Sequence, residues 1–176
     1  MLIFIANITF LITILWGFIK LLFILLQPME SLNIIGIAVS TTNQNGQAAQ
    51  DIGQLWGRFY GEDIPGKITN KAGDEVYSVY TDYESDYTGE YTTFIGFKVH
   101  SLDAVPEGLV GRTFEPQQFK KFTAKGTMPQ AIVETWQQIW QNDETLHRSY
   151  RYDYELYGAL SQNGENPEVD IFIGVN

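Results

Sequence analysis

One glutamate in the C-terminal part of the chain has neighbours that favour a binding site for a cation. Glu155 belongs to the segment Tyr152–Tyr157, YDYELY, which is typical of a β-strand. Side chains alternate between the two faces of a strand, so Asp153, Glu155 and Tyr157 share one face. That face meets either water or a groove, and the residues alone leave both alternatives open.

The opposite face of this strand carries Tyr152, Tyr154 and Leu156. Large side chains of this kind suit a face that is covered by helices. We therefore expect the helices of the fold to pack on the side of Tyr154 and not on the side of Glu155.

Aromatic residues from other segments are expected near Glu155. Tyr80 occupies the matching side of an earlier strand, and Phe172 is expected to point the same way from the last strand. With Tyr157 and with Trp136 from the apolar stripe of a helix, these residues form the predicted ligand-binding set. A carboxylate among rings favours a cation, because each good contact with a ring face adds about 0.5–2 kcal/mol. Without a cation, burial would raise the pKa of the glutamate.

Other catalytic and metal-binding patterns are weak. The chain has no cysteine, which excludes disulfides, thiolate nucleophiles and cysteine-ligated metals. The two histidines, His100 and His147, are not at a metal-ligand spacing, and the acidic run Asp82, Glu84 and Asp86 lacks the glycine and terminal glutamate of a calcium loop. Since glycine-rich phosphate loops and nucleophile elbows are also missing, we predict no cofactor and no metal.

The charge balance separates classes of partner. The chain of 176 residues has 21 acidic and 11 basic side chains, a formal net charge of -10. Nucleic-acid binding needs a basic surface, so we expect no direct binding of nucleic acid. The same negative charge attracts cations at long range.

The helices and strands expected around Glu155 follow an order that occurs twice. Each half of the chain after Met29 is predicted to contain a strand, an amphipathic helix and two further strands. The segment between Gly108 and Gly126 is read as one long strand or two strands broken at Pro116. The fold class is therefore α+β with duplicated βαββ units.

Both predicted helices carry a tryptophan on the apolar face, Trp56 in the first and Trp136 in the second. A repeated βαββ unit predicts a pseudo-twofold antiparallel sheet, with a central groove and one helix over each half. The alternative is an ordinary α+β domain in which the repeat is a coincidence.

The first 28 residues differ from the rest. Lys20 is the only charged residue between Met1 and Pro28, and the run MLIFIANITFLITILWGFIKLLFILL is long enough to cross a bilayer. An N-terminal apolar helix that anchors the chain in a membrane is one interpretation, and a protein that begins at Met29 is the other. A cleavable signal peptide fits poorly, because no basic segment precedes the run and no small-residue cleavage site follows it. The predicted domains are residues 1–28 and 29–176.

The repeated βαββ order, the helix PQAIVETWQQIW and the strand pair YDYELYG and EVDIFIGV resemble the effector-binding, or gyrase-inhibitor-like, domain of bacterial transcription activators. The chain is especially similar to the stand-alone, integron-associated effector-binding proteins. The resemblance covers residues 30–176. It implies a ligand groove between the two repeats with a glutamate at its base, and by position that glutamate is Glu155.

The resemblance implies a module that binds small amphipathic or cationic aromatic compounds, for sensing or sequestration in the cytoplasm. No helix-turn-helix pattern precedes Met29, so a separate regulator protein or a second copy of the chain is the expected partner. Two alternatives stay open. One is a hydrolase of strained electrophiles, with Glu155 in acid–base chemistry and Tyr80 or Tyr157 as its hydrogen-bonding partner. The other is inhibition of a topoisomerase through a protein surface.

Overall fold

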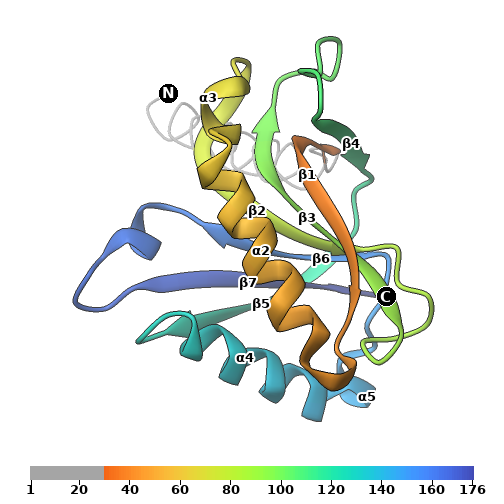
Figure 1. Ribbon diagram of the computed structural model, residues 1–176. Helices are drawn as coiled ribbons and strands as arrows, with labels where there is room; N and C mark the ends of the chain where they lie inside the picture. The colour runs from red at the N-terminus through yellow and green to blue at the C-terminus, as the bar shows by residue number, and fades with distance from the viewer. Residues whose placement is uncertain (1–29) are drawn as a thin grey trace, which may run out of the picture. The chain divides into compact units, whose positions relative to one another are not determined.

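The computed structural model describes residues 30–176 (Figure 1). The predictions for residues 1–28, an apolar helix and a membrane anchor, lie outside these residues. Within the described part, none of the helices combines the length and the apolar character needed to span a bilayer. Residues Ser31–Asn176 form one compact unit.

All seven described strands belong to one antiparallel sheet, which confirms the α+β class. Their order across the sheet is β4-β1-β3-β2-β6-β7-β5. The strands are β1 (Leu32–Thr42), β2 (Lys71–Thr81), β3 (Glu90–Val99), β4 (Val110–Phe114), β5 (Gln118–Lys125), β6 (Tyr152–Tyr157) and β7 (Glu168–Val175). The helices are α2 (Gln47–Gly61), α3 (Ile64–Lys67), α4 (Gln130–Gln141) and α5 (Asp143–Leu146), with the 3-10 turns η1 (Gln44–Gly46) and η2 (Ala159–Gln162).

The same order of elements fills each half of the sheet. The first unit, β1-α2-β2-β3, supplies the neighbouring strands β1-β3-β2, and the second unit, β5-α4-β6-β7, supplies β6-β7-β5. The halves meet where β2 pairs with β6. The remaining strand, β4, lies beside β1 at one edge of the sheet, outside both units.

The predicted segment around Pro116 is divided between the two edges of the sheet. Its first part is β4, next to β1, and its second part is β5, next to β7. Proline has no backbone N–H to donate to a neighbouring strand, so Pro116 interrupts the pairing. The three residues 115–117 connect one edge strand to the other. Rings of Phe114 and Phe119, one from each edge, lie 5.1 and 5.4 Å from the ring of Tyr152. The sheet is therefore strongly curved.

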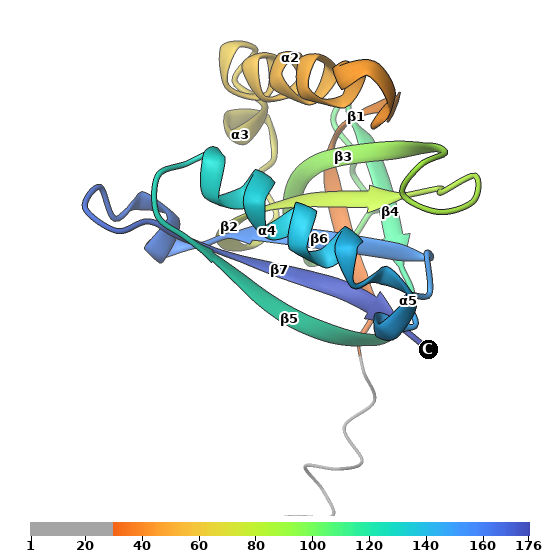
Figure 2. The same cartoon turned by 90° about the horizontal axis from the view of Figure 1, so that it is seen from below.

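Helices α2 and α4 cover the same face of the sheet (Figure 2). A row of paired residues crosses this face: Ile37, Ile95, Ser78, Glu155 and Ile171. Under α2 the core contains Leu55, Phe59 and the strand residues Ile35, Ile37, Ile95 and Phe97. Under α4 it contains Trp136, Ile139 and the strand residues Ile171 and Ile173. The isoleucines at the two ends of the row pack against the helices. The polar residues at its centre, Ser78 and Glu155, lie between α2 and α4.

The prediction that helices cover the Tyr154 side of β6 is wrong. The helices lie on the Glu155 side, and Tyr152 and Tyr154 face the inner side of the curved sheet. There they pack with Phe114, Phe119 and Phe172. The curvature of the sheet buries this second face without a helix, which is why a large aromatic face did not indicate where the helices lie.

Candidate ligand-binding site

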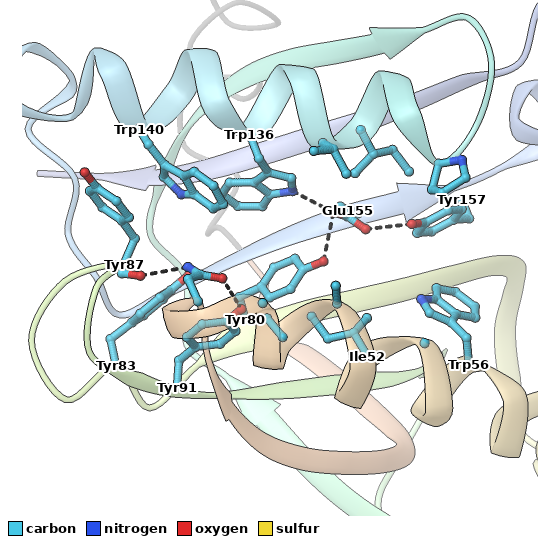
Figure 3. A pocket seen from close by; sticks show the side chains of 18 residues that line it. Ile52, Trp56, Tyr80, Tyr83, Tyr87, Tyr91, Trp136, Trp140, Glu155 and Tyr157 are labelled. Carbon is cyan, nitrogen blue, oxygen red and sulfur yellow. Dashed lines mark hydrogen bonds between the residues drawn. The ribbon is translucent and has the colours of Figure 1, made fainter.

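A pocket of about 540 Å³ lies between α2 and α4, above the strands where the two halves of the sheet meet (Figure 3). Small apolar residues of α2, among them Ala49 and Gly53, form one wall, and α4 contributes Ile132 and Val133 to the opposite wall. The aromatic residues of the lining are Trp56, Tyr80, Tyr83, Tyr87, Tyr91, Trp136, Trp140 and Tyr157. Among the eighteen lining residues, Glu155 is the one that carries a formal charge.

The carboxylate of Glu155 is held by three donors from three elements. Its Oε1 accepts hydrogen bonds from the Tyr80 hydroxyl at 2.8 Å and from Trp136 Nε1 at 2.7 Å. Its Oε2 accepts one from the Tyr157 hydroxyl at 2.7 Å. Glu155 is 2% exposed, so these donors replace most of the water that a carboxylate would otherwise bind.

All three donors to Glu155 are neutral. Burial raises the pKa of Glu155 above its ordinary value, and the hydrogen bonds from Tyr157, Trp136 and Tyr80 oppose this rise only in part. The pKa values of Tyr80 and Tyr157 are raised as well, mainly by burial and secondly by the negative charge of Glu155. Both hydroxyls therefore keep their protons at neutral pH. Within residues 30–176, the ion pairs of the structure do not include Glu155. The pocket is therefore a negative site without a counter-ion from these residues.

The two units contribute to the site in matching ways. Each helix places a tryptophan against a tyrosine of the other unit: Trp56 of α2 lies 5.0 Å from Tyr157, and Trp136 of α4 lies 5.1 Å from Tyr80, both edge-on. Tyr80 and Tyr157 both donate to Glu155. The two halves of the sheet thus carry one site between them, as the predicted groove requires.

A second buried carboxylate near the pocket is already neutralised. Asp153 accepts a hydrogen bond of 2.6 Å from Arg148, and both side chains are fully buried. Asp153 also accepts from the hydroxyl of the lining residue Tyr83 at 2.7 Å and from the backbone N–H of Gly174 at 2.8 Å. Arg148 is further paired with Asp143 at 3.1 Å. This cluster fixes Tyr83 in place and leaves Glu155 as the uncompensated charge.

The structure brings together four of the five predicted ligand-binding residues: Glu155, Tyr80, Tyr157 and Trp136. The placement of Phe172 on this side is wrong. Phe172 pairs with Tyr154 across β6 and β7, and their rings stack at 4.6 Å on the other face of the sheet. The residue of β7 that pairs with Glu155 is Ile171.

Several lining residues were not predicted. Trp140 follows Trp136 by one helical turn on the same apolar stripe, so its spacing could have indicated it. Trp56 is the predicted counterpart of Trp136, but its position in the sequence did not indicate that it belongs to the site. Tyr87 and Asn43 lie in loops, where no periodicity places a side chain. Among residues 30–176, no group of three or more histidine, aspartate or glutamate side chains is arranged to hold a metal ion.

Residues 26–175 match the family model of the integron-associated effector binding proteins. The chain belongs to this family. The predicted resemblance to the stand-alone, integron-associated effector-binding proteins is thereby confirmed.

Two solved structures share the fold, and a curated protein is similar in sequence. The integron cassette protein VCH_CASS2 from the mobile metagenome of Vibrio cholerae is 29% identical, with a TM-score of 0.65 over 85% of this chain and 94% of that one. The protein SAV2435, whose structure was solved with bound tetraphenylphosphonium, is 20% identical, with a TM-score of 0.70 over 85% of this chain and 92% of that one. The transcriptional regulator BrlR of Pseudomonas aeruginosa is 33% identical over 136 residues, which are 74% of this chain and 48% of BrlR.

Proposed function

We propose that this protein binds small, lipophilic aromatic cations, as a sensor or a sequestering module. The observation that carries the proposal is the carboxylate of Glu155, buried in an aromatic pocket with neutral donors. A buried charge without a counter-ion is unfavourable. A cation in the pocket would remove that penalty, and the faces of the surrounding rings would attract the same cation.

The hydrogen bonds of Glu155 favour a particular kind of cation. Oε1 already accepts two hydrogen bonds and Oε2 accepts one, so about one of the four acceptor positions of the carboxylate is free. A primary ammonium or a guanidinium needs several acceptors to replace its water. A quaternary cation has no N–H group and needs none, and we infer that the pocket prefers cations without N–H donors.

The comparisons support the same class of ligand. SAV2435 carries tetraphenylphosphonium, a quaternary cation with four aromatic rings. The family to which this chain belongs is named for effector binding. The pocket volume of about 540 Å³ lies in the range of about 300–1,000 Å³ that is usual for small-molecule sites.

The proposal is tested with a matched pair of ligands. Methyltriphenylphosphonium is a cation, and triphenylphosphine oxide is a neutral molecule of similar shape. In Glu155→Gln we expect the affinity for the cation to fall ten- to a hundredfold, which corresponds to about 1.5–3 kcal/mol for a contact with a charged group. The affinity for the neutral molecule should change less than threefold. Isothermal titration of both ligands measures these values.

Phe172→Leu is the control variant, because Phe172 lies on the other face of the sheet. Both of its affinities should equal those of the unchanged protein. Equal cation affinities in Glu155→Gln and the unchanged protein would contradict the proposal. The hydrolase alternative would use the same carboxylate, and it predicts that an electrophilic ligand recovered after incubation has gained the mass of water.

A further inference from the structure

Two stacked rings from different elements lie at one end of the pocket. The ring of Tyr87 lies 5.4 Å from the ring of Trp140, and the two planes differ by 8° (Figure 3). Trp140 is in the last turn of α4, whereas Tyr87 is in the loop between β2 and β3. Both residues line the pocket.

The backbone of this loop is attached to the segment before α2. Asn43 Nδ2 donates a hydrogen bond of 2.7 Å to the carbonyl of Tyr87, and Gln44 Nε2 donates one of 3.1 Å to the carbonyl of Thr88. Asn43 is itself fixed, because its Oδ1 accepts a hydrogen bond of 2.8 Å from the Tyr91 hydroxyl. The backbone of Tyr87 is therefore anchored, while its ring meets α4 through a stacking contact.

The other rings near Glu155 are held more firmly. Tyr80, Tyr91 and Trp136 are each at most 8% exposed and belong to regular elements. Tyr80 and Trp136 are also hydrogen-bonded to the carboxylate. Tyr87 is half-buried and belongs to a loop. A ligand that extends beyond the space around Glu155 in this direction meets the Tyr87 ring as its boundary.

We propose that Tyr87 is a specificity-determining residue, which sets the length of the ligand that the pocket accepts at the Trp140 end. This inference rests on the proposed binding of lipophilic cations. A short cation fills the space beside Glu155 and leaves the Tyr87–Trp140 stack in place. A longer one reaches the stack, where the Tyr87 ring blocks the path of its further atoms.

The inference is tested with alkyltriphenylphosphonium ions whose alkyl chain grows from methyl to octyl. In the unchanged protein the affinity should rise about fourfold with each added methylene, which is the factor for about 0.8 kcal/mol per buried methylene. It should then stop rising at a definite chain length. In Tyr87→Ala this break, the chain length at which the affinity stops rising, should move to chains that are at least two methylenes longer, with each affinity expressed relative to that of the methyl member in the same variant.

Two further variants separate the ring of Tyr87 from a general loss of tyrosine. Tyr87→Phe keeps the ring and should keep the break of the unchanged protein. Tyr60→Ala removes a tyrosine that is 61% exposed and does not line the pocket, and it should also leave the break unchanged. A break at the same chain length in Tyr87→Ala and the unchanged protein would overturn the inference and leave the proposed function intact. Failure of the unchanged protein to bind the methyl member would overturn the proposed function and this inference with it.

Discussion

At the scale of single residues, Glu155 and Asp153 show two ways to bury a carboxylate two positions apart on one strand. Asp153 is paired with the guanidinium of Arg148 at 2.6 Å, so its charge is compensated within the protein. Glu155 receives hydrogen bonds from two hydroxyls and one indole, which stabilise its charge without cancelling it. The first arrangement is structural, and the second leaves a charge for a ligand to complete.

The binding of a permanent cation should depend on pH through Glu155. Burial raises the pKa of Glu155 above the ordinary value of about 4.3, and only the ionised form attracts the ligand. We expect the affinity for methyltriphenylphosphonium to rise with pH up to the raised pKa and then to level off, with a slope of at most about tenfold per pH unit below it. Titrations from pH 4.5 to 8 measure this profile, and Glu155→Gln should give a flat one.

The raised pKa of Glu155 affects folding stability in the opposite direction: stability falls with pH, whereas the affinity for the cation rises. The folded protein holds the proton of Glu155 more tightly than the unfolded chain does, so this group stabilises the fold at low pH. The contribution is complete below the unfolded pKa and is lost as pH rises through the folded pKa. In ligand-free protein, the melting temperature of Glu155→Gln relative to the unchanged protein should therefore increase with pH.

For the affinity, a pH profile that is flat in the unchanged protein would contradict the assignment of the charge to Glu155.

At the scale of elements, α2 offers a matched pair of glycines. Gly53 and Gly57 are one turn apart in the helix, and an added Cβ would meet open space at both. Only Gly53 of the two lines the pocket. Leucine is a better helix former than glycine by up to about 1 kcal/mol, so both replacements should maintain or raise the melting temperature.

Their effects on binding should differ. The leucine side chain of Gly53→Leu enters the space of the ligand, and we expect the affinity for tetraphenylphosphonium to fall at least tenfold. Gly57→Leu should bind as the unchanged protein does. Fluorescence titration, with melting curves for both variants, measures the two effects. A similar affinity in the two variants would show that this wall of the pocket does not contact the ligand.

The sequence predicted whether each main element is a helix or a strand better than it predicted which elements lie next to one another in the fold. Helical spacing indicated α2 and α4, and runs rich in Val, Ile and Tyr indicated the strands, because local periodicity reflects which side chains are buried. The separation of β4 from β5 to opposite edges was not predictable, since a break at Pro116 says nothing about direction. The faces of β6 were reversed, because both carry large aromatic residues and only the curvature of the sheet distinguishes them.

The same limit explains what was predicted of the site. Tyr80, Glu155 and Tyr157 were grouped correctly, because they follow from alternation within β2 and β6. Phe172 was misplaced, because a shift of one residue in the pairing of β6 and β7 reverses the face. Tyr87 carried no signal, because its position depends on a loop and on a stacking partner in α4.

At the scale of the whole molecule, the described residues contain a core that extends through both halves of the sheet. Its buried apolar residues run from Ile34 to Ile173, and both βαββ units lie within the compact unit Ser31–Asn176. We propose that the chain from Met29 to Asn176 folds on its own. It should unfold cooperatively, show a near-ultraviolet circular dichroism signal from its packed aromatic rings, and bind methyltriphenylphosphonium. A broad melting transition without that signal would contradict this prediction.

The register where the two units meet pairs Glu155 with Ser78, its counterpart in the first unit. Ser78 is fully buried in the same row of side chains. A strictly symmetric protein would carry two carboxylates at this place, and like charges so close cannot both ionise. A protein made of two copies of the second half would therefore have the same aromatic rings around the site. Its two carboxylates, however, would share one proton, and neither would carry a full negative charge. The site therefore depends on the difference between the two halves. The second half supplies the carboxylate of Glu155, and the first half has the hydroxyl of Ser78 at the matching position, so that no second carboxylate opposes the ionisation of Glu155.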